Sequence, residues 1–145
     1  MSDQSQSALN SALIDMSRSF LQYVAEGWPW VDSERQAVGD QVLALAESQR
    51  SDVAAIVELL NEREHFIDFG SFPTEYTDLQ FLALDAMFSW LENSQQVVIA
   101  STAAAEQTVK AAEDAEAAEL MEVIHSRQKE LADKLKEVRS QAPVQ

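Results

Sequence analysis

The stretch FIDFGSFPTEYTDLQFLALD, residues 66–85, decides how the helices on either side of it are connected. Gly70 can adopt the left-handed backbone conformation that often ends a helix, and Pro73 cannot continue one. Thr74 can accept hydrogen bonds from the free amides of a following helix. The stretch therefore predicts the end of one helix, a corner, and the start of the next.

The same stretch is rich in aromatic side chains, namely Phe66, Phe69, Phe72 and Tyr76. This much apolar surface is costly to leave in water. We therefore expect the four rings to pack down as a cap on one end of the molecule, and we interpret the corner as structural first.

Two helices are predicted on the N-terminal side of the corner. Apolar residues recur every three or four positions over residues 6–26 and again over residues 33–67, which indicates an amphipathic helix in each range. Trp28-Pro29-Trp30 separates the two helices, because proline disfavours helix at the residue before it. The first apolar stripe consists of Leu9, Leu13, Met16, Phe20 and Val24.

Two further helices are predicted after the corner, over residues 74–100 and 102–139. No glycine or proline marks their junction, so we place it at Ser101 or Thr102, either of which can cap a helix. Acidic residues then fill the first half of the last helix and basic residues the second half, which suits the helix dipole. The C-terminal tail is expected to fray.

Four helices joined by three short connections predict an all-α, up-down-up-down four-helix bundle. The composition agrees, because 46% of the residues are hydrophobic and the chain has only three glycines and three prolines. Few breaks of this kind favour long helices over strands and turns. We expect a single domain that spans residues 1–145.

The net charge and the absence of cysteine exclude several classes of binding partner and of reactive site. Twenty-five acidic residues against ten basic ones give a net charge of −15, which repels phosphate backbones and anionic lipids and argues against nucleic-acid or membrane binding. The chain has no cysteine, which excludes disulfides, thiolate metal sites and cysteine nucleophiles. Without a signal-peptide pattern or a membrane-spanning apolar run, we expect a cytoplasmic protein.

Two Glu-x-x-His units, at residues 62–65 and 122–125, have the spacing of a known kind of metal site. In these four residues the chain resembles the ferritin-like di-iron family, whose four-helix bundles hold iron with two such units and further carboxylates. The resemblance implies iron as cofactor and a metal-binding or oxidase function. The ligands that it implies are Glu62, His65, Asp78 or Glu75, Glu122 and His125.

The rotation of these residues about their helix axes favours a different interpretation. At 100° per residue, Glu62, Glu122 and His125 lie far from the apolar stripes of their helices. Packing the stripes together would turn these side chains toward solvent. On this alternative the two motifs belong to solvated helix faces.

The remaining signals favour a non-enzymatic protein that works by contact with another protein or with a second copy of itself. No catalytic triad spacing and no phosphate-binding glycine loop are present. Trp28, Trp30 and Trp90 are the expected contact residues, and the Ala-rich range 100–118 allows close helix approach in a homo-oligomer. As an alternative, the two tryptophans beside Pro29 would plug one end of the bundle.

Charge is also distributed unevenly along the chain. Between Glu64 and Glu106 there are acidic residues but no lysine or arginine, whereas residues 127–139 hold five basic ones. We expect the basic segment to lie beside the start of the helix predicted over residues 74–100, which would pair the two charges within one molecule.

Overall fold

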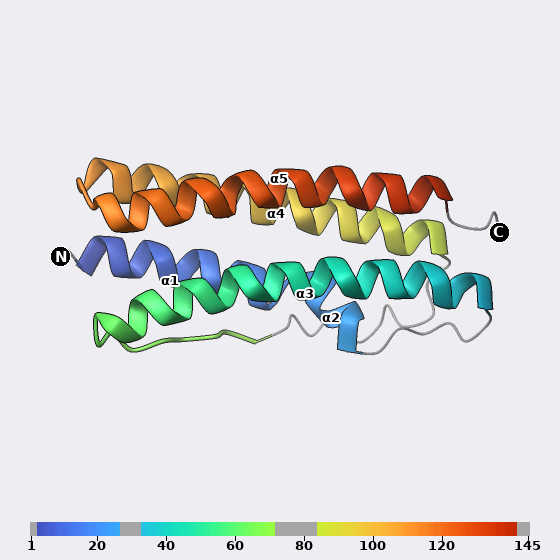
Figure 1. Cartoon of the computed structure of the whole chain (residues 1–145), viewed down its shortest axis with the longest axis horizontal. Coiled ribbons are helices and arrows are strands. Elements are labelled where there is room, and N and C mark those ends of the chain that lie inside the picture. Colours follow the sequence, from blue (N-terminus) through green and yellow to red (C-terminus); the bar gives the residue numbers. More distant parts are fainter. Residues whose placement is uncertain (1–2, 27–32, 72–83, 142–145) are drawn as a thin grey trace.

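The computed structural model describes residues 3–26, 33–71 and 84–141, and within these ranges it contains five helices and no strand (Figure 1). The all-α prediction is confirmed. None of these helices has both the length and the apolar character needed to span a bilayer. The helices are α1 (Asp3–Ser17), α2 (Phe20–Glu26), α3 (Ser33–Glu62), α4 (Leu84–Ala111) and α5 (Ala115–Gln141).

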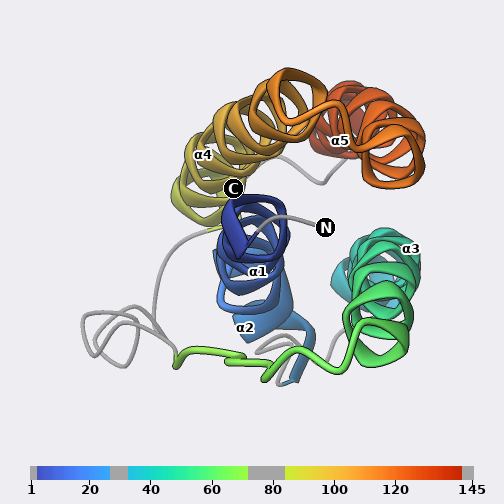
Figure 2. The same cartoon turned by 90° about the vertical axis from the view of Figure 1, so that its left-hand side faces the viewer.

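The five helices occupy four positions around a shared interior (Figure 2). The consecutive helices α1 and α2 fill one position, and both contact α3 and α4. Helix α5 closes the arrangement, because it packs against α3 and α4. Each position therefore has two neighbours, and the apolar stripes meet in the middle.

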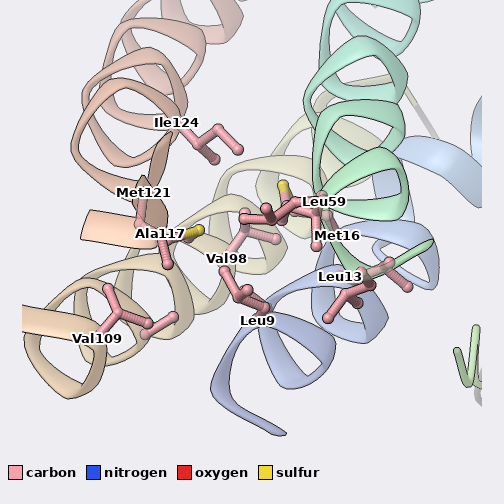
Figure 3. Close-up of a cluster of buried hydrophobic side chains, with 13 residues drawn as sticks. Leu9, Leu13, Met16, Leu59, Val98, Val109, Ala117, Met121 and Ile124 are labelled. Atoms are coloured by element: carbon pink, nitrogen blue, oxygen red, sulfur yellow. The ribbon is translucent and has the colours of Figure 1, made fainter. Parts of the chain in front are cut away.

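Two apolar clusters fill the interior, one toward each end of the helices. The Phe20 cluster joins α2, the first halves of α3 and α4, and the end of α5; it consists of Phe20, Leu21, Val24, Val38, Val42, Ala46, Met87, Phe88, Leu91, Leu131, Leu135 and Val138. The Leu13 cluster joins α1, the second halves of α3 and α4, and the start of α5 (Figure 3); it consists of Leu9, Ala12, Leu13, Met16, Ile56, Leu59, Leu60, Val98, Ala105, Val109, Ala117, Met121 and Ile124.

These clusters define the direction of each helix. The first halves of α3 and α4 lie in one cluster and the second halves of both lie in the other, so α3 and α4 run in the same direction. The predicted up-down-up-down order with short connections is therefore wrong. The end of α3 and the start of α4 therefore lie at opposite ends of the molecule (Figure 1). Helix α4, with 28 residues, is about 42 Å long.

Residues 63–71, which follow α3, run along α1. The side-chain amide of Asn10 donates to the Asp68 carbonyl oxygen and accepts from the Asp68 amide, both at 3.0 Å. Gly70 has the expected left-handed conformation, with φ of 71°, but it does not end a helix. An added Cβ would lie only 2.8 Å from Ile14 Cγ2, so glycine allows the extended segment to pass close to α1.

Helices α3 and α4 both end in a Schellman motif with a glutamate in the left-handed conformation. After α3, Glu64 has φ of 55°, and the His65 amide donates to the Leu60 carbonyl oxygen at 3.0 Å. After α4, Glu113 has φ of 59°. The second helix was predicted to continue to residue 67, and this motif is the reason that it ends at residue 62.

The predicted junction at Ser101 or Thr102 is also wrong, because α4 continues without a break to Ala111. The Thr102 hydroxyl hydrogen-bonds to carbonyl oxygens one turn earlier in α4. It is therefore used inside the helix and does not cap one. Asp114 caps α5 instead, since its Oδ1 accepts from the Ala117 amide at 3.3 Å.

The first predicted helix, residues 6–26, is divided into α1 and α2. The hydroxyl of Ser19, between the two helices, donates to Gln49 Oε1 of α3 at 3.1 Å. The Phe20 amide at the start of α2 donates to Ser94 Oγ of α4 at 3.0 Å. Side chains from α3 and α4 thus satisfy polar groups at a break that hydrophobic periodicity alone does not indicate.

Three predictions fall outside the described residues. They are the Trp28-Pro29-Trp30 corner, the start of the third helix at residue 74, and the tail after residue 141. Phe72 and Tyr76 of the expected aromatic cap lie outside as well.

Replacing Glu113 with glycine is expected to raise the free energy of unfolding by about 0.5–1 kcal/mol, because glycine removes the left-handed strain at some cost in unfolded-state entropy. Urea unfolding followed by circular dichroism would measure the change. Glu119→Gly provides the control: Glu119 is exposed inside α5, and the same substitution there should lower stability by about 1 kcal/mol. Equal effects at the two sites would contradict the strain argument.

Candidate functional site

A layer of buried polar side chains separates the two apolar clusters at the level of the α1–α2 break. All four positions of the fold contribute to it, and none of its members is more than 5% exposed. We call it the polar layer, and it consists of Ser19, Gln22, Gln49, Asp52, Gln95 and Gln128.

Gln49 is the centre of the polar layer. Its Oε1 accepts hydrogen bonds from Ser19 Oγ at 3.1 Å and from Gln22 Nε2 at 2.9 Å. Its Nε2 donates to Gln95 Oε1 at 3.2 Å and to Gln128 Oε1 at 3.1 Å. Within the described residues, no buried side-chain nitrogen or oxygen of the layer lacks a partner.

An arginine contacts the polar layer on each of its two sides. Arg50 Nε donates to Gln22 Oε1 at 2.8 Å on one side. On the other side, Asp52 accepts from Gln128 Nε2 at 2.7 Å and forms an ion pair with Arg127 Nε at 3.2 Å. Burial raises the pKa of Asp52, and the charge of Arg127 and the hydrogen bond from Gln128 act against that rise.

The chemistry of the polar layer is structural. Its four glutamine amides are neither nucleophiles nor general bases, and its carboxylate, Asp52, is paired with Gln128 and Arg127. It does fix the relative height of the helices, because a slip of one turn would move each amide into an apolar cluster without a partner. One sequence signal pointed to the layer: Gln95 lies on the apolar stripe of α4 between Leu91 and Val98.

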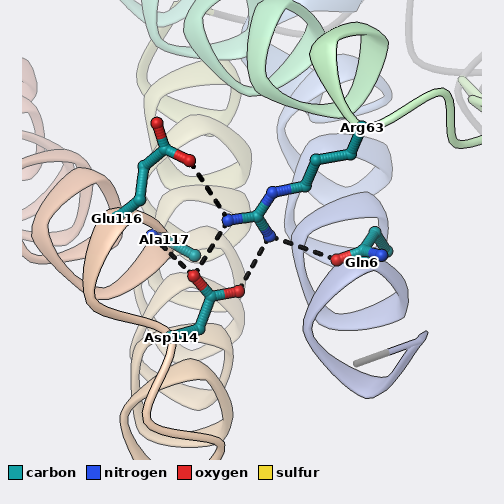
Figure 4. A network of polar contacts seen from close by, with 5 residues as sticks. All are labelled: Gln6, Arg63, Asp114, Glu116 and Ala117. Atoms are coloured by element: carbon teal, nitrogen blue, oxygen red, sulfur yellow. Dashed lines mark hydrogen bonds and ion pairs between the residues drawn. The ribbon is translucent and has the colours of Figure 1, made fainter. Parts of the chain in front are cut away.

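A second polar cluster lies at the end of the bundle where α1 and α5 begin (Figure 4). Arg63, just after α3, makes two hydrogen bonds to the Asp114 carboxylate, at 2.8 and 2.9 Å. The two side chains are only 5% and 6% exposed. Arg63 also donates to Gln6 Oε1 of α1 at 3.1 Å and to Glu116 Oε1 of α5 at 3.3 Å.

Hydrogen bonding dominates the electrostatics of this pair. The hydrogen bonds from Arg63 hold the pKa of Asp114 below its usual value, although desolvation acts in the opposite direction. The same contact raises the pKa of Arg63. The paired charges tie the end of α3 and the start of α5 to α1.

Four members of the implied iron site are described: Glu62 and His65 lie at and just after the end of α3, and Glu122 and His125 lie on α5. Glu62 is exposed at the end of α3. Glu122 is 69% exposed and lies 4.0 Å from Lys110 Nζ, and His125 Nδ1 lies 3.1 Å from Thr102 Oγ1. Across the three described ranges, no group of three or more histidine or acidic side chains is arranged to hold a metal ion. Asp78 lies outside those ranges.

The two corner aromatic residues that the structure describes, Phe66 and Phe69, do not pack down as the expected cap. Phe66 is 84% exposed and Phe69 is 51% exposed, because residues 63–71 run along the outside of α1 and present these rings outward. The proposed contact residues Trp28 and Trp30 lie outside the described part of the chain. Trp90 is 37% exposed and packs one side of its ring against Phe20, with ring centroids 5.8 Å apart.

The expected pairing of the basic segment with the acidic region is present at one point. Arg139, in the last turn of α5, donates to Glu92 Oε2 of α4 at 2.9 Å and to Ser89 Oγ at 3.2 Å. Both contacts lie near the start of α4, where the prediction placed them.

The outward face of α4 carries a regular uncharged stripe. Its residues recur at alternating spacings of three and four, opposite the buried face of the same helix. Val97 is the most exposed large apolar residue on it, at 61%. We call this stripe the outer seam; it consists of Trp90, Asn93, Val97, Ala100, Ala104, Gln107 and Ala111, all exposed.

Comparison with known proteins found no protein-family model, no curated protein and no solved structure that matches the chain.

Proposed function

We propose that the protein acts without catalysis, by packing the outer seam of α4 against the same seam of a second copy. The observation that carries this proposal is a seam of seven exposed, uncharged residues on a chain with a net charge of −15. Charged residues are depleted from the centres of protein interfaces. Two such acidic molecules repel each other least when the surfaces that meet carry no charged side chains.

The spacing of the outer seam supports a helix-to-helix contact. Trp90, Val97, Ala104 and Ala111 are each seven residues apart, which is the repeat that lets two helices pack along their length. The seam covers about 30 Å of helix. A two-fold symmetric contact of this kind would bring identical surfaces together.

The sizes of the side chains favour an antiparallel contact. Trp90 lies at the start of the seam, whereas Ala104 and Ala111 lie at its end. In an antiparallel pair, each tryptophan would face the small residues of the other copy, and aromatic anchors over small residues are typical of energetically important contacts. Ala100 would lie close to the two-fold axis.

The substitution Ala100→Glu tests the proposal. Two glutamates near a two-fold axis would repel each other, and we expect the dimer dissociation constant to rise at least about 100-fold. Sedimentation velocity over a range of protein concentrations would measure it. Ala54→Glu is the matched control, because Ala54 is also an exposed helical alanine, on α3, and this change should leave the dimer intact. A wild-type chain that remains monomeric, or a dimer unaffected by Ala100→Glu, would refute the proposal.

A further inference from the structure

A groove of about 410 Å³ lies between α3 and α5, within the range of about 300–1,000 Å³ common for small-molecule sites. Its apolar surface comes from Ala44 and Leu45 of α3 and from Leu131 of α5. Two cationic side chains of α5, Arg127 and Lys134, also line it. A groove with this lining is unexpected on so acidic a chain.

Arg127 is held in place by the polar layer. Its Nε pairs with Asp52 Oδ1 at 3.2 Å, and the Asp52 side chain is only 5% exposed, whereas that of Arg127 is 45% exposed. The other carboxylate oxygen of Asp52 accepts from Gln128 at 2.7 Å. A buried carboxylate with two such contacts orients the guanidinium, whose terminal nitrogens make no other hydrogen bond or ion pair to described residues.

Lys134 provides a second cation on the same side of α5. It makes no hydrogen bond or ion pair within the described part of the chain. Seven residues separate it from Arg127, which is two helical turns, or about 10 Å along the axis. The apolar side chain of Leu131 lies between the two cations in sequence, and Leu45 faces it from α3.

We propose that the groove between α3 and α5 binds a linear organic dicarboxylate, with one carboxylate on Arg127 and the other on Lys134. The hydrocarbon chain would lie over Leu45 and Leu131 and remove the exposed apolar surface of Leu45, which is only partly buried, from water. Planar guanidinium groups bind carboxylates through two parallel hydrogen bonds. This site is separate from the outer seam of α4, so its occupancy does not depend on dimer formation.

One carboxylate of the protein opposes such a ligand. Glu130 also lines the groove and reduces its positive charge at neutral pH. A Glu130→Gln substitution should therefore tighten binding about threefold to tenfold, in the direction opposite to the loss of a cation.

Titration of the full-length protein with adipate, suberate, sebacate and dodecanedioate tests the proposal. The methyl resonances of Leu45 and Leu131 would report binding by nuclear magnetic resonance, and calorimetry would give the affinity. We expect saturable binding that is tightest for the member whose carboxylates match the separation of the two cations. The monomethyl ester of that member should bind about tenfold more weakly, because it retains one charge.

Lys134→Gln should lower the affinity for the tightest-binding dicarboxylate about tenfold. Lys136→Gln removes the same charge from the same helix but lies outside the groove. It should change that affinity less than twofold. Circular dichroism would verify that both variants are folded. Absence of saturable methyl shifts would overturn the proposal. Equal affinities across the ligand series, or equal effects of the two lysine substitutions, would also overturn it, since both would indicate only general attraction of anions.

Discussion

Replacing Arg63 with alanine is expected to lower the free energy of unfolding by about 3–5 kcal/mol, the range found when one partner of a buried ion pair is removed. The Asp114 carboxylate, 6% exposed, would keep its charge in a site that excludes water but would lose both of its guanidinium hydrogen bonds. Gln6 and Glu116 would lose their link to the end of α3 at the same time. Urea unfolding followed by circular dichroism measures the loss.

Arg18→Ala is a suitable control. Arg18 forms its ion pair with Asp15 at 3.8 Å, and its side chain is 47% exposed. Surface pairs of this kind contribute about 0–1 kcal/mol, so this variant should remain close to the wild type. If both arginine variants lost the same stability, the buried position of Arg63 would not be the cause.

The same ion pair makes stability depend on pH. Because the folded-state pKa of Asp114 is lowered, its contribution is present above the unfolded value of about 3.9 and is lost as the pH falls through the lower folded value. We expect the wild-type protein to lose stability below about pH 4 more steeply than Asp114→Asn. Parallel curves for the two proteins would show that Asp114 is not the group that titrates.

Replacing Gln49 with leucine is expected to cost about 2–4 kcal/mol. The substitution removes four hydrogen bonds in the centre of the polar layer, and each buried polar group left without a partner costs about 1–3 kcal/mol. Ser19 Oγ would lose its acceptor and Gln95 Oε1 its donor, whereas Gln22 Nε2 would keep its bond to the Ala46 carbonyl oxygen. The measured quantity is again the free energy of unfolding in urea.

Gln41→Leu makes the same chemical change at an exposed position of α3 and should alter stability by less than about 0.5 kcal/mol. The double variant Gln49→Leu with Gln95→Leu completes a cycle. The two losses should not be additive, because Gln128 Oε1 accepts hydrogen bonds from both amides and loses its last donor only in the double variant. Additive losses would show that the two amides are energetically independent.

The helices and much of the core follow from sequence periodicity. Leu9, Leu13, Met16, Phe20 and Val24, the stripe expected for the first helix, are all buried. Short-range physics determines this pattern, since an amphipathic helix must bury its apolar side. The outward position of Trp90 on α4 follows from the same argument.

The direction of α4 could not be read from the sequence in the same way. Gly70 indicates the left-handed backbone conformation, which other residues avoid. That conformation occurs both in a tight corner between two helices and in an extended segment that runs beside α1. The contact that selects the second, between Gly70 and Ile14, joins residues far apart in the chain. The α4–α5 turn was missed for another reason: Glu113 adopts a backbone conformation that glycine normally marks.

Most of the polar layer could not be predicted from the sequence, because glutamine is a good helix former on any face of a helix. A glutamine in a helical segment therefore does not indicate whether its side chain is buried or exposed. Gln49 and Gln128 become distinctive only when four positions place their amides at one level. The Glu-x-x-His units show the opposite case, a pattern that is visible in the sequence. Their spacing does not determine whether the glutamate and histidine side chains point into the bundle or toward solvent.

The course of the chain has a mechanical consequence. Helix α1 begins at one end of the molecule and α5 finishes at the other (Figure 1), so a tensile load applied between them acts along the helix axes. Such a load shears every helix interface at once and does not peel one helix away at a time. The molecule should therefore yield to stretching in a single abrupt step, at a force set by the rate of unfolding.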